Sequence, residues 1–136
     1  MLQQAAALCC RTERGWPEVL LITTRRSRNW IIPKGWLIDG FTACQSARQE
    51  AWEEAGVRGK CFKQPVGRFS YQKHRSKKGS ALCIVDVFPL FVQSMAADFP
   101  ECGQRQRKWF SPEKAASRVN IAELATLLRK IGPDIH

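Results

Sequence analysis

Residues 35–57 read GWLIDGFTACQSARQEAWEEAGV, and the organisation of the rest of the chain is most easily understood from this segment. Its second half carries the signals of a helix. Thr42 is a favourable N-cap, and Gln45 follows three residues later, where it completes a capping box. Gly56 occupies the position of a left-handed C-cap. These signals predict a helix from about Ala43 to Ala55.

Three glutamates share one face of this predicted helix. Glu50, Glu53 and Glu54 stand at i, i+3 and i+4, so they fall within an arc of roughly 100°. Like charges at this spacing destabilise a helix, and no lysine or arginine lies among them. Mg²⁺ would turn the repulsion into attraction, because it prefers carboxylate and carbonyl oxygens. The alternative is a solvated acidic helix face.

Another face of the helix carries a row of small side chains, which lets it pack closely against a sheet: Ala43, Ala47, Ala51 and Ala55. Apolar and β-branched runs predict the strands of that sheet at residues 4–10, 18–23, 30–32, 61–72, 81–92 and 106–110. Between them, residues 34–40 are predicted to form a loop and residues 73–79 a turn dense in positive charge.

Two further helices are expected near the C-terminus. Ser111-Pro112-Glu113 has the order of a cap, a first-position proline and an acid. Asn120 with Glu123 repeats the capping pattern before an apolar stripe that ends at Gly132-Pro133. The whole order predicts one α/β domain over residues 1–136, with helices covering both faces of a mixed sheet.

The charge balance favours an anionic partner. Lysine and arginine number 22 against 12 aspartates and glutamates, a formal net charge of +10 in 136 residues. Such an excess suits nucleic acid, phosphorylated small molecules or anionic lipid, and charge alone does not choose among them.

The cysteines and the hydropathy favour a cytoplasmic protein. The six cysteines form no CxxC pair and no cluster with zinc spacing, so we expect them to be reduced and mostly buried. No run is long enough to span a membrane, and the N-terminus lacks the basic region of a signal peptide. We therefore expect no membrane association.

The segment over residues 35–57 resembles the Nudix signature: Gly, five residues, Glu, seven residues, then Arg-Glu-U-x-Glu-Glu-x-Gly-U, where U is a bulky aliphatic residue. The spacing is intact, and the residues that match are Gly35, Glu50, Glu53, Glu54, Gly56 and Val57. Phe41 replaces the first Glu and Gln49 replaces the Arg. Losing both avoids leaving one charge unpaired in a partly buried place.

The similarity extends beyond the signature, to the diphosphoinositol polyphosphate phosphohydrolase branch of the family, over residues 20–34, 66–75 and 105–112. It implies a Nudix-type α/β/α sandwich with a mixed sheet between helices. It also implies hydrolysis of phosphoanhydride bonds in a polyanionic substrate, such as a diphosphoinositol polyphosphate or a dinucleoside polyphosphate. The cofactor would be Mg²⁺, with Mn²⁺ as a substitute.

The resemblance assigns roles to the acids and to the basic loops. Glu50, Glu53 and Glu54 are the expected catalytic residues, and together with the carbonyl of Gly35 they are the expected metal ligands. One of the acids, Glu50 or Glu53, would orient or deprotonate the attacking water. The expected substrate-binding residues are Arg25, Arg26, Arg28, Lys34, Lys73, His74, Arg75 and Arg105. Each could equally be an ordinary surface cation.

Two alternatives remain open. Trp36 could stack on a base, as in a nucleoside-triphosphate or RNA 5′-end pyrophosphohydrolase. Phe41 and Gln49 would also suit a catalytically weak domain that binds an anion or a nucleic acid. Retention of all three glutamates argues against a pure anion binder, since clustered carboxylates repel anions. Both a monomer and a homodimer are compatible with the sequence.

Overall fold

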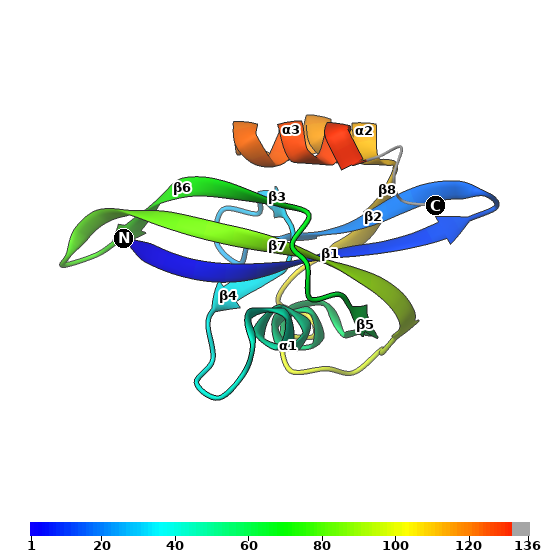
Figure 1. Cartoon of the computed structure of the whole chain (residues 1–136), viewed down its shortest axis with the longest axis horizontal. Coiled ribbons are helices and arrows are strands. Elements are labelled where there is room, and N and C mark those ends of the chain that lie inside the picture. Colours follow the sequence, from blue (N-terminus) through cyan, green and yellow to red (C-terminus); the bar gives the residue numbers. More distant parts are fainter. Residues whose placement is uncertain (132–136) are drawn as a thin grey trace.

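An eight-stranded mixed sheet lies between two helical layers in the computed structural model, which describes residues 1–131 (Figure 1). Helix α1 (Ala43–Ala55) covers one face, and α2 (Pro112–Arg118) and α3 (Ala122–Ile131) cover the other. The predicted α/β/α sandwich is therefore confirmed. The predicted end of the last helix at Gly132-Pro133 lies outside the described residues. No helix in the described part is long and apolar enough to cross a membrane.

The two longest strands, β1 (Leu2–Glu13) and β7 (Gly79–Met95), pair in parallel and form the middle of the sheet. All the other pairings are antiparallel. On the β1 side lie β4 and β2, and β2 pairs in turn with β3 and β8; on the β7 side lie β5 and β6. Their bounds are β2 Trp16–Thr23, β3 Trp30–Ile31, β4 Lys34–Trp36, β5 Val57–Cys61, β6 Gly67–Arg75 and β8 Arg107–Phe110.

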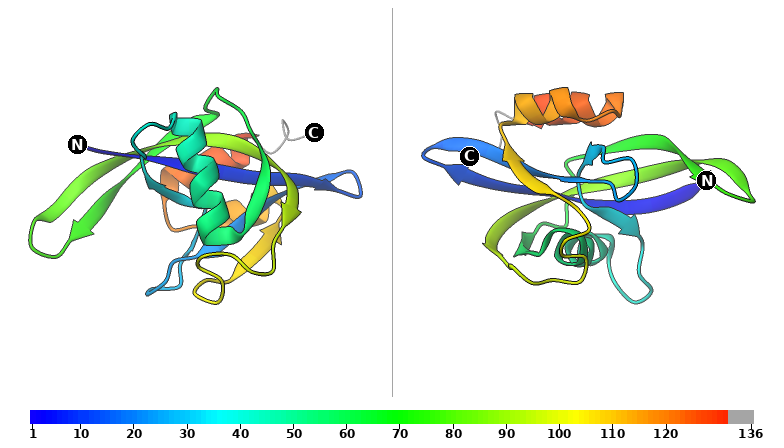
Figure 2. Two further views of the ribbon diagram at one scale, coloured as in Figure 1. Left: turned by 90° about the horizontal axis from the view of Figure 1, so that it is seen from below. Right: turned by 180° about the vertical axis from the view of Figure 1, so that it is seen from behind.

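Helix α1 has the predicted bounds. Thr42 and Gln45 form a complete capping box, and Gly56 adopts the left-handed conformation with φ of 67°. Ala47, Ala51 and Ala55 are fully buried, and the helix packs mainly on β1 (Figure 2, left). The small side chains therefore bring the helix close to the sheet, which fixes the direction in which its glutamates point.

Several boundaries differ from the sequence-based predictions. Residues 34–36 form a strand instead of a loop, because their backbone pairs with β1. The predicted strand over 61–72 is two strands, β5 and β6, which pair with different parts of β7. Pro89 lies where β7 changes partner from β6 to β5. The predicted turn over 73–79 is shorter, because pairing with β7 continues to Arg75.

The last helix begins at Ala122, two residues after the predicted cap Asn120, and Glu123 lies in its first turn as predicted. The Glu123 carboxylate accepts hydrogen bonds from the backbone N–H and the hydroxyl of Ser70. Glu123 therefore ties α3 to β6. The cap at Ser111, with Pro112 at the start of α2, is as predicted. None of the six cysteines forms a disulfide, but Cys102 is exposed where burial was expected.

Candidate active site

A cleft of about 800 Å³ is lined by both ends of the Nudix-like segment, with Gly35 and Trp36 from its start and the three glutamates from helix α1. Strands β1, β4 and β6, helix α1, and the segments after β2 and before β8 all contribute to its wall. Acidic side chains come from α1 and cations come from the surrounding strands and loops. The lining residues are Gln4, Thr24, Arg25, Arg26, Ile31, Ile32, Lys34, Gly35, Trp36, Glu50, Glu53, Glu54, Lys73, Glu101 and Arg105.

Glu50 and Glu54 form a close carboxyl pair one helical turn apart. Glu54 is only 8% exposed and Glu50 is half-buried, and each carboxyl group contributes to the pKa shift of the other. Burial, reinforced by the charge of Glu50 and opposed by that of Arg105, raises the pKa of Glu54 to about 8. Burial likewise raises the pKa of Glu50. Two acids are thus held together at a position where a proton or a cation must compensate their charge.

Gly35 leaves the space that the Glu50 carboxyl group occupies. A Cβ atom at this position would overlap the carboxyl carbon and both oxygens of Glu50. The backbone N–H of the preceding residue, Lys34, donates to Glu54 Oε1 at 3.2 Å. Strand β4 therefore meets the acid pair through its backbone, and a side chain at position 35 would displace the Glu50 carboxyl group.

These residues fit a hard divalent cation. Mg²⁺ is commonly bound through one or two carboxylates and keeps several waters. The Glu50–Glu54 pair offers carboxylate oxygens from successive turns of one helix, and the neighbouring Gly35 has no side chain that would obstruct those of Glu50. Glu53 lines the same cleft from the same helix. Within residues 1–131, however, no three acidic, histidine or cysteine side chains converge closely enough to hold one ion. Of the possible metal ligands, Glu50 and Glu54 are therefore the best placed.

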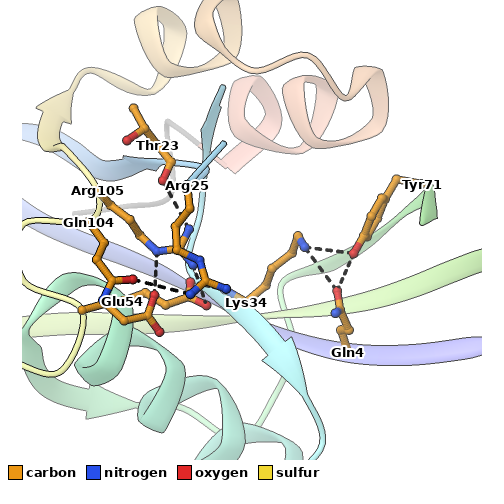
Figure 3. A network of polar contacts seen from close by, with 9 residues as sticks. Gln4, Thr23, Arg25, Lys34, Glu54, Tyr71, Gln104 and Arg105 are labelled. Carbon is orange, nitrogen blue, oxygen red and sulfur yellow. Dashed lines mark hydrogen bonds and ion pairs between the residues drawn. The ribbon is translucent and has the colours of Figure 1, made fainter. Parts of the chain in front are cut away.

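Arg105 is the most thoroughly paired cation of the cleft (Figure 3). Its side chain is 10% exposed, and it lies 3.7 Å from Glu54 Oε2. It donates to Glu101 Oε1 at 3.0 Å and to the Thr23 carbonyl at 3.2 Å. The guanidinium therefore links α1, the end of β2 and the segment before β8, and its charge is neutralised by protein acids. Its position in the cleft agrees with the prediction, but its bonds are made to the protein.

Lys34 is held differently. Its Nζ donates to the Tyr71 hydroxyl at 2.9 Å and to Gln4 Oε1 at 3.4 Å, and the Tyr71 hydroxyl donates to the same Gln4 oxygen at 2.8 Å (Figure 3). Burial, with a contribution from Lys73, lowers the pKa of this ammonium group. Strands β4, β1 and β6 thus combine to hold a cation at the wall of the cleft.

The other predicted substrate-binding residues fall into two groups. Arg25, Arg26 and Lys73 line the cleft. Arg28, His74 and Arg75 are not among its lining residues. His74 contacts the Ser80 hydroxyl across the β6–β7 hairpin, at 2.9 Å. The alternation of side chains along β6 explains why Lys73 faces the cleft and His74 does not.

Trp36 lines the cleft and is 46% exposed, with Lys73 Nζ 5.4 Å from its ring centre. The two departures from the Nudix signature lie elsewhere. Phe41 is exposed, and Gln49 lines a separate pocket on the other side of α1. The loop before α1 is held instead by Ser46, which is buried and whose hydroxyl accepts from the N–H of Ile38 at 3.0 Å.

Three functional residues were missed from the sequence: Gln4 and Glu101, which line the cleft, and Tyr71, which bonds to Lys34. Gln4 begins the buried run of residues 4–10, which is otherwise apolar, and its polarity there was the available signal. Glu101 stands four residues before Arg105, outside any predicted element, so spacing gave no reason to pair them.

The family model described as the NUDIX domain matches residues 1–134. Among curated proteins, "Nudix hydrolase 13, mitochondrial" of Arabidopsis thaliana is 30% identical over 103 residues, which cover 72% of this chain and 51% of that protein. "Diphosphoinositol polyphosphate phosphohydrolase 3-alpha" of Mus musculus is 31% identical over 115 residues, covering 83% and 66% respectively. The chain thus spans about half the length of the plant relatives that it matches.

Solved structures show the same fold. The crystal structure of a C. elegans Ap4A hydrolase superposes with a TM-score of 0.71 at 21% identity, covering 100% of this chain and 99% of the other. The E. coli dihydroneopterin triphosphate pyrophosphohydrolase gives 0.70 at 16% identity, covering 97% and 95%. At these identities the likeness concerns the arrangement of the chain alone.

Proposed function

This chain belongs to the NUDIX domain family, and we propose that it is a Mg²⁺-dependent hydrolase of phosphoanhydride bonds in a small polyanionic substrate. The observation that carries the proposal is the composition of one cleft. A carboxyl pair, buried Glu54 and half-buried Glu50, shares the cleft with cations from four other parts of the chain. An acid pair alone would suit a cation and a basic wall alone would suit an anion. Their juxtaposition suits a phosphate group bound beside a divalent metal.

Glu50 and Glu54 are the proposed metal ligands, with Glu53 and the Gly35 carbonyl as further oxygen donors. When bound, the ion would neutralise phosphate oxygens and make water more acidic. Glu53, or Glu50, accepts the proton as a water oxygen forms a bond to phosphorus. The bond from that phosphorus to the bridging oxygen breaks, and the electron pair leaves with the departing phosphate. Arg105 keeps Glu54 in place throughout.

The lysines and arginines that line the cleft favour a substrate with several phosphate groups. Arg25 and Arg26 lie in the segment after β2, whereas Lys34 and Lys73 come from β4 and β6. They can contact phosphates on either side of the scissile bond, and arginine can do so with two donors. A diphosphoinositol polyphosphate or a dinucleoside polyphosphate offers several such phosphates. The similarity to the mouse diphosphoinositol polyphosphate phosphohydrolase supports the first of these.

One observation favours a nucleotide. Trp36 exposes nearly half of its surface in the cleft wall, where its ring could stack on a nucleobase. A dinucleoside polyphosphate, a nucleoside triphosphate or a triphosphorylated RNA 5′ end would use this contact, and an inositol ring would not use it in the same way.

A substrate panel tests the proposal. Phosphate release with Mg²⁺ should be measured on a diphosphoinositol polyphosphate, a dinucleoside polyphosphate, a nucleoside triphosphate and a 5′-triphosphorylated RNA. We expect turnover of at least one, with the highest kcat/KM for a substrate with more than three phosphates. Trp36→Leu should lower kcat/KM about tenfold for nucleotides and leave an inositol substrate nearly unchanged. Failure to hydrolyse any member would overturn the proposed function.

A further inference from the structure

The two innermost cations of the cleft have opposite electrostatic surroundings. Arg105 lies against two acids, Glu54 and Glu101, which neutralise it. Lys34 forms no ion pair with an acid anywhere in residues 1–131. Its ammonium is bound by two neutral oxygens, those of Tyr71 and Gln4. The carboxylate of Glu54 is bonded to the backbone N–H of Lys34 and not to its Nζ.

The bonds of Lys34 leave one donor available. An ammonium group has three N–H donors, and two of them are used by Tyr71 and Gln4. Lys34 lines the cleft, so a ligand can approach the remaining donor. The Tyr71 ring also lies beside the ammonium, with Nζ 4.5 Å from its centre. A partly buried positive charge without an acidic partner is stabilised by a bound anion.

We propose that Tyr71 and Gln4 are positioning residues, which hold the Lys34 ammonium at the cleft wall where the proposed function has it receive a phosphate group of the substrate. The inference rests on the proposed function in taking that ligand to be the substrate. Gln4 is 4% exposed and lies on β1, the middle strand, so it is a rigid support. The Tyr71 hydroxyl donates to Gln4 while accepting from Lys34, which fixes its direction. A lysine held in advance loses less side-chain freedom when the ligand binds.

The Tyr71→Phe substitution tests the positioning role in turnover. It keeps the ring beside Lys34 and removes only the hydroxyl. We expect KM for the anionic substrate to rise about five- to tenfold, the effect of one net hydrogen bond, with kcat within about twofold of wild type. A purely structural role would lower the melting temperature without this split. Lys60→Met is the matched control, because Lys60 also lies beside a ring, 5.2 Å from Phe62, but does not line the cleft.

A binding experiment separates this inference from the proposed function. Tyr71 is the only tyrosine of the sequence, so 3-fluorotyrosine labels one position for ¹⁹F NMR. Methylenediphosphonate, whose P–C–P link cannot be hydrolysed, serves as the probe. We expect a saturable shift of the resonance in wild type and in Lys60→Met, and its loss in Lys34→Met.

An equal shift in Lys34→Met, the absence of a shift in wild type, or an unchanged KM in Tyr71→Phe would each overturn the inference. If the shift depends on Lys34 but no phosphoanhydride is hydrolysed, the phosphate site stands and the hydrolase proposal fails. Turnover accompanied by a shift that is independent of Lys34 gives the reverse result.

Discussion

At the scale of single residues, Glu54 should make the stability of the metal-free protein depend on pH. Its pKa is raised from 4.5 to about 8 in the folded state, so the folded protein binds the proton more tightly than the unfolded chain does. The resulting stabilisation is complete below pH 4.5 and is lost as the pH rises through 8. One pKa unit corresponds to about 1.4 kcal/mol, so the loss is on the order of a few kcal/mol.

The measurement is urea unfolding in excess chelator at several pH values between 5 and 9. Wild type should lose stability with rising pH, and Glu54→Gln should show a much flatter profile, because its amide does not ionise. Mg²⁺ should stabilise wild type more at high pH than at low pH, since metal and proton compete for the same oxygens. An identical pH profile in the two proteins would show that Glu54 is not the titrating group.

Gly35 should be required for metal binding rather than for folding alone. In Gly35→Ala, the added Cβ would overlap the Glu50 carboxyl group and displace it. We expect at least tenfold weaker Mg²⁺ affinity, by calorimetry with the folded protein. Gly40→Ala is the control: its Cβ meets nothing within 4 Å, but its φ of 83° strains alanine. That variant should lose stability and keep its Mg²⁺ affinity. Unchanged affinity in Gly35→Ala would contradict the role given to β4.

At the scale of elements, Arg105 should hold α1 to the segments that flank β2 and β8. Arg105→Met leaves Glu54 and Glu101 without their shared partner. Breaking a buried pair in this way costs about 3–5 kcal/mol, measured at a pH where both acids are ionised. Arg68→Met is the comparison, because the Arg68–Asp86 pair is formed at 2.8 Å but the arginine side chain is 63% exposed. Its loss should change the stability much less, because solvent screens an exposed pair. Equal losses in the two variants would show that the Arg105 network contributes no more than a surface pair.

The alternation of side chains along β6 predicts unequal roles for adjacent basic residues. Lys73 lines the cleft, whereas His74 contacts Ser80 on the other face of the hairpin. Lys73→Ala should therefore raise KM for a polyanionic substrate several-fold, and His74→Ala should leave KM unchanged. Steady-state kinetics on the two variants checks this. A larger effect at position 74 would mean that the substrate lies across the opposite face of the hairpin.

The sequence predicts elements well where local signals and tertiary packing agree. Helix α1 was predicted to the residue because Thr42, Gln45 and Gly56 specify both of its ends. Strand β4 was missed because Lys34–Trp36 has no strand pattern of its own and exists only through pairing with β1. The Lys34–Tyr71–Gln4 group was missed for a related reason: its members lie far apart in sequence, and the sheet order brings them together.

At the scale of the whole molecule, the acids of the site could be predicted from the sequence. Which cations pair with protein acids, and which are left to bind the substrate, could not. The spacing of Glu50, Glu53 and Glu54 within one helix places them together whatever the rest of the chain does. The net charge of +10 indicated an anionic partner without indicating which lysines and arginines face it. That depended on the fold, which places Lys34 at the cleft wall beside neutral side chains and places Arg105 against two acids, Glu54 and Glu101.

The basic character of the molecule should also appear in the salt dependence of substrate binding. Exposed cations such as Arg25 and Arg26 are screened by salt, because the Debye length falls from about 10 Å at 0.1 M to 3 Å at 1 M. We therefore expect KM to rise with ionic strength, more steeply for a substrate with many phosphates than for one with two. Equal salt dependence for both would show that only the cations nearest the scissile bond contribute.

Phosphate release as a function of Mg²⁺ concentration is the most direct test of the proposed chemistry. The protein should first be freed of metal with excess chelator and then titrated, with the best substrate of the panel. Activity should be absent in chelator, return saturably with Mg²⁺ or Mn²⁺, and stay at least a hundredfold lower in a folded Glu54→Gln variant. Full turnover in excess chelator, or wild-type activity in Glu54→Gln, would contradict a metal-dependent hydrolase built on the Glu50–Glu54 pair.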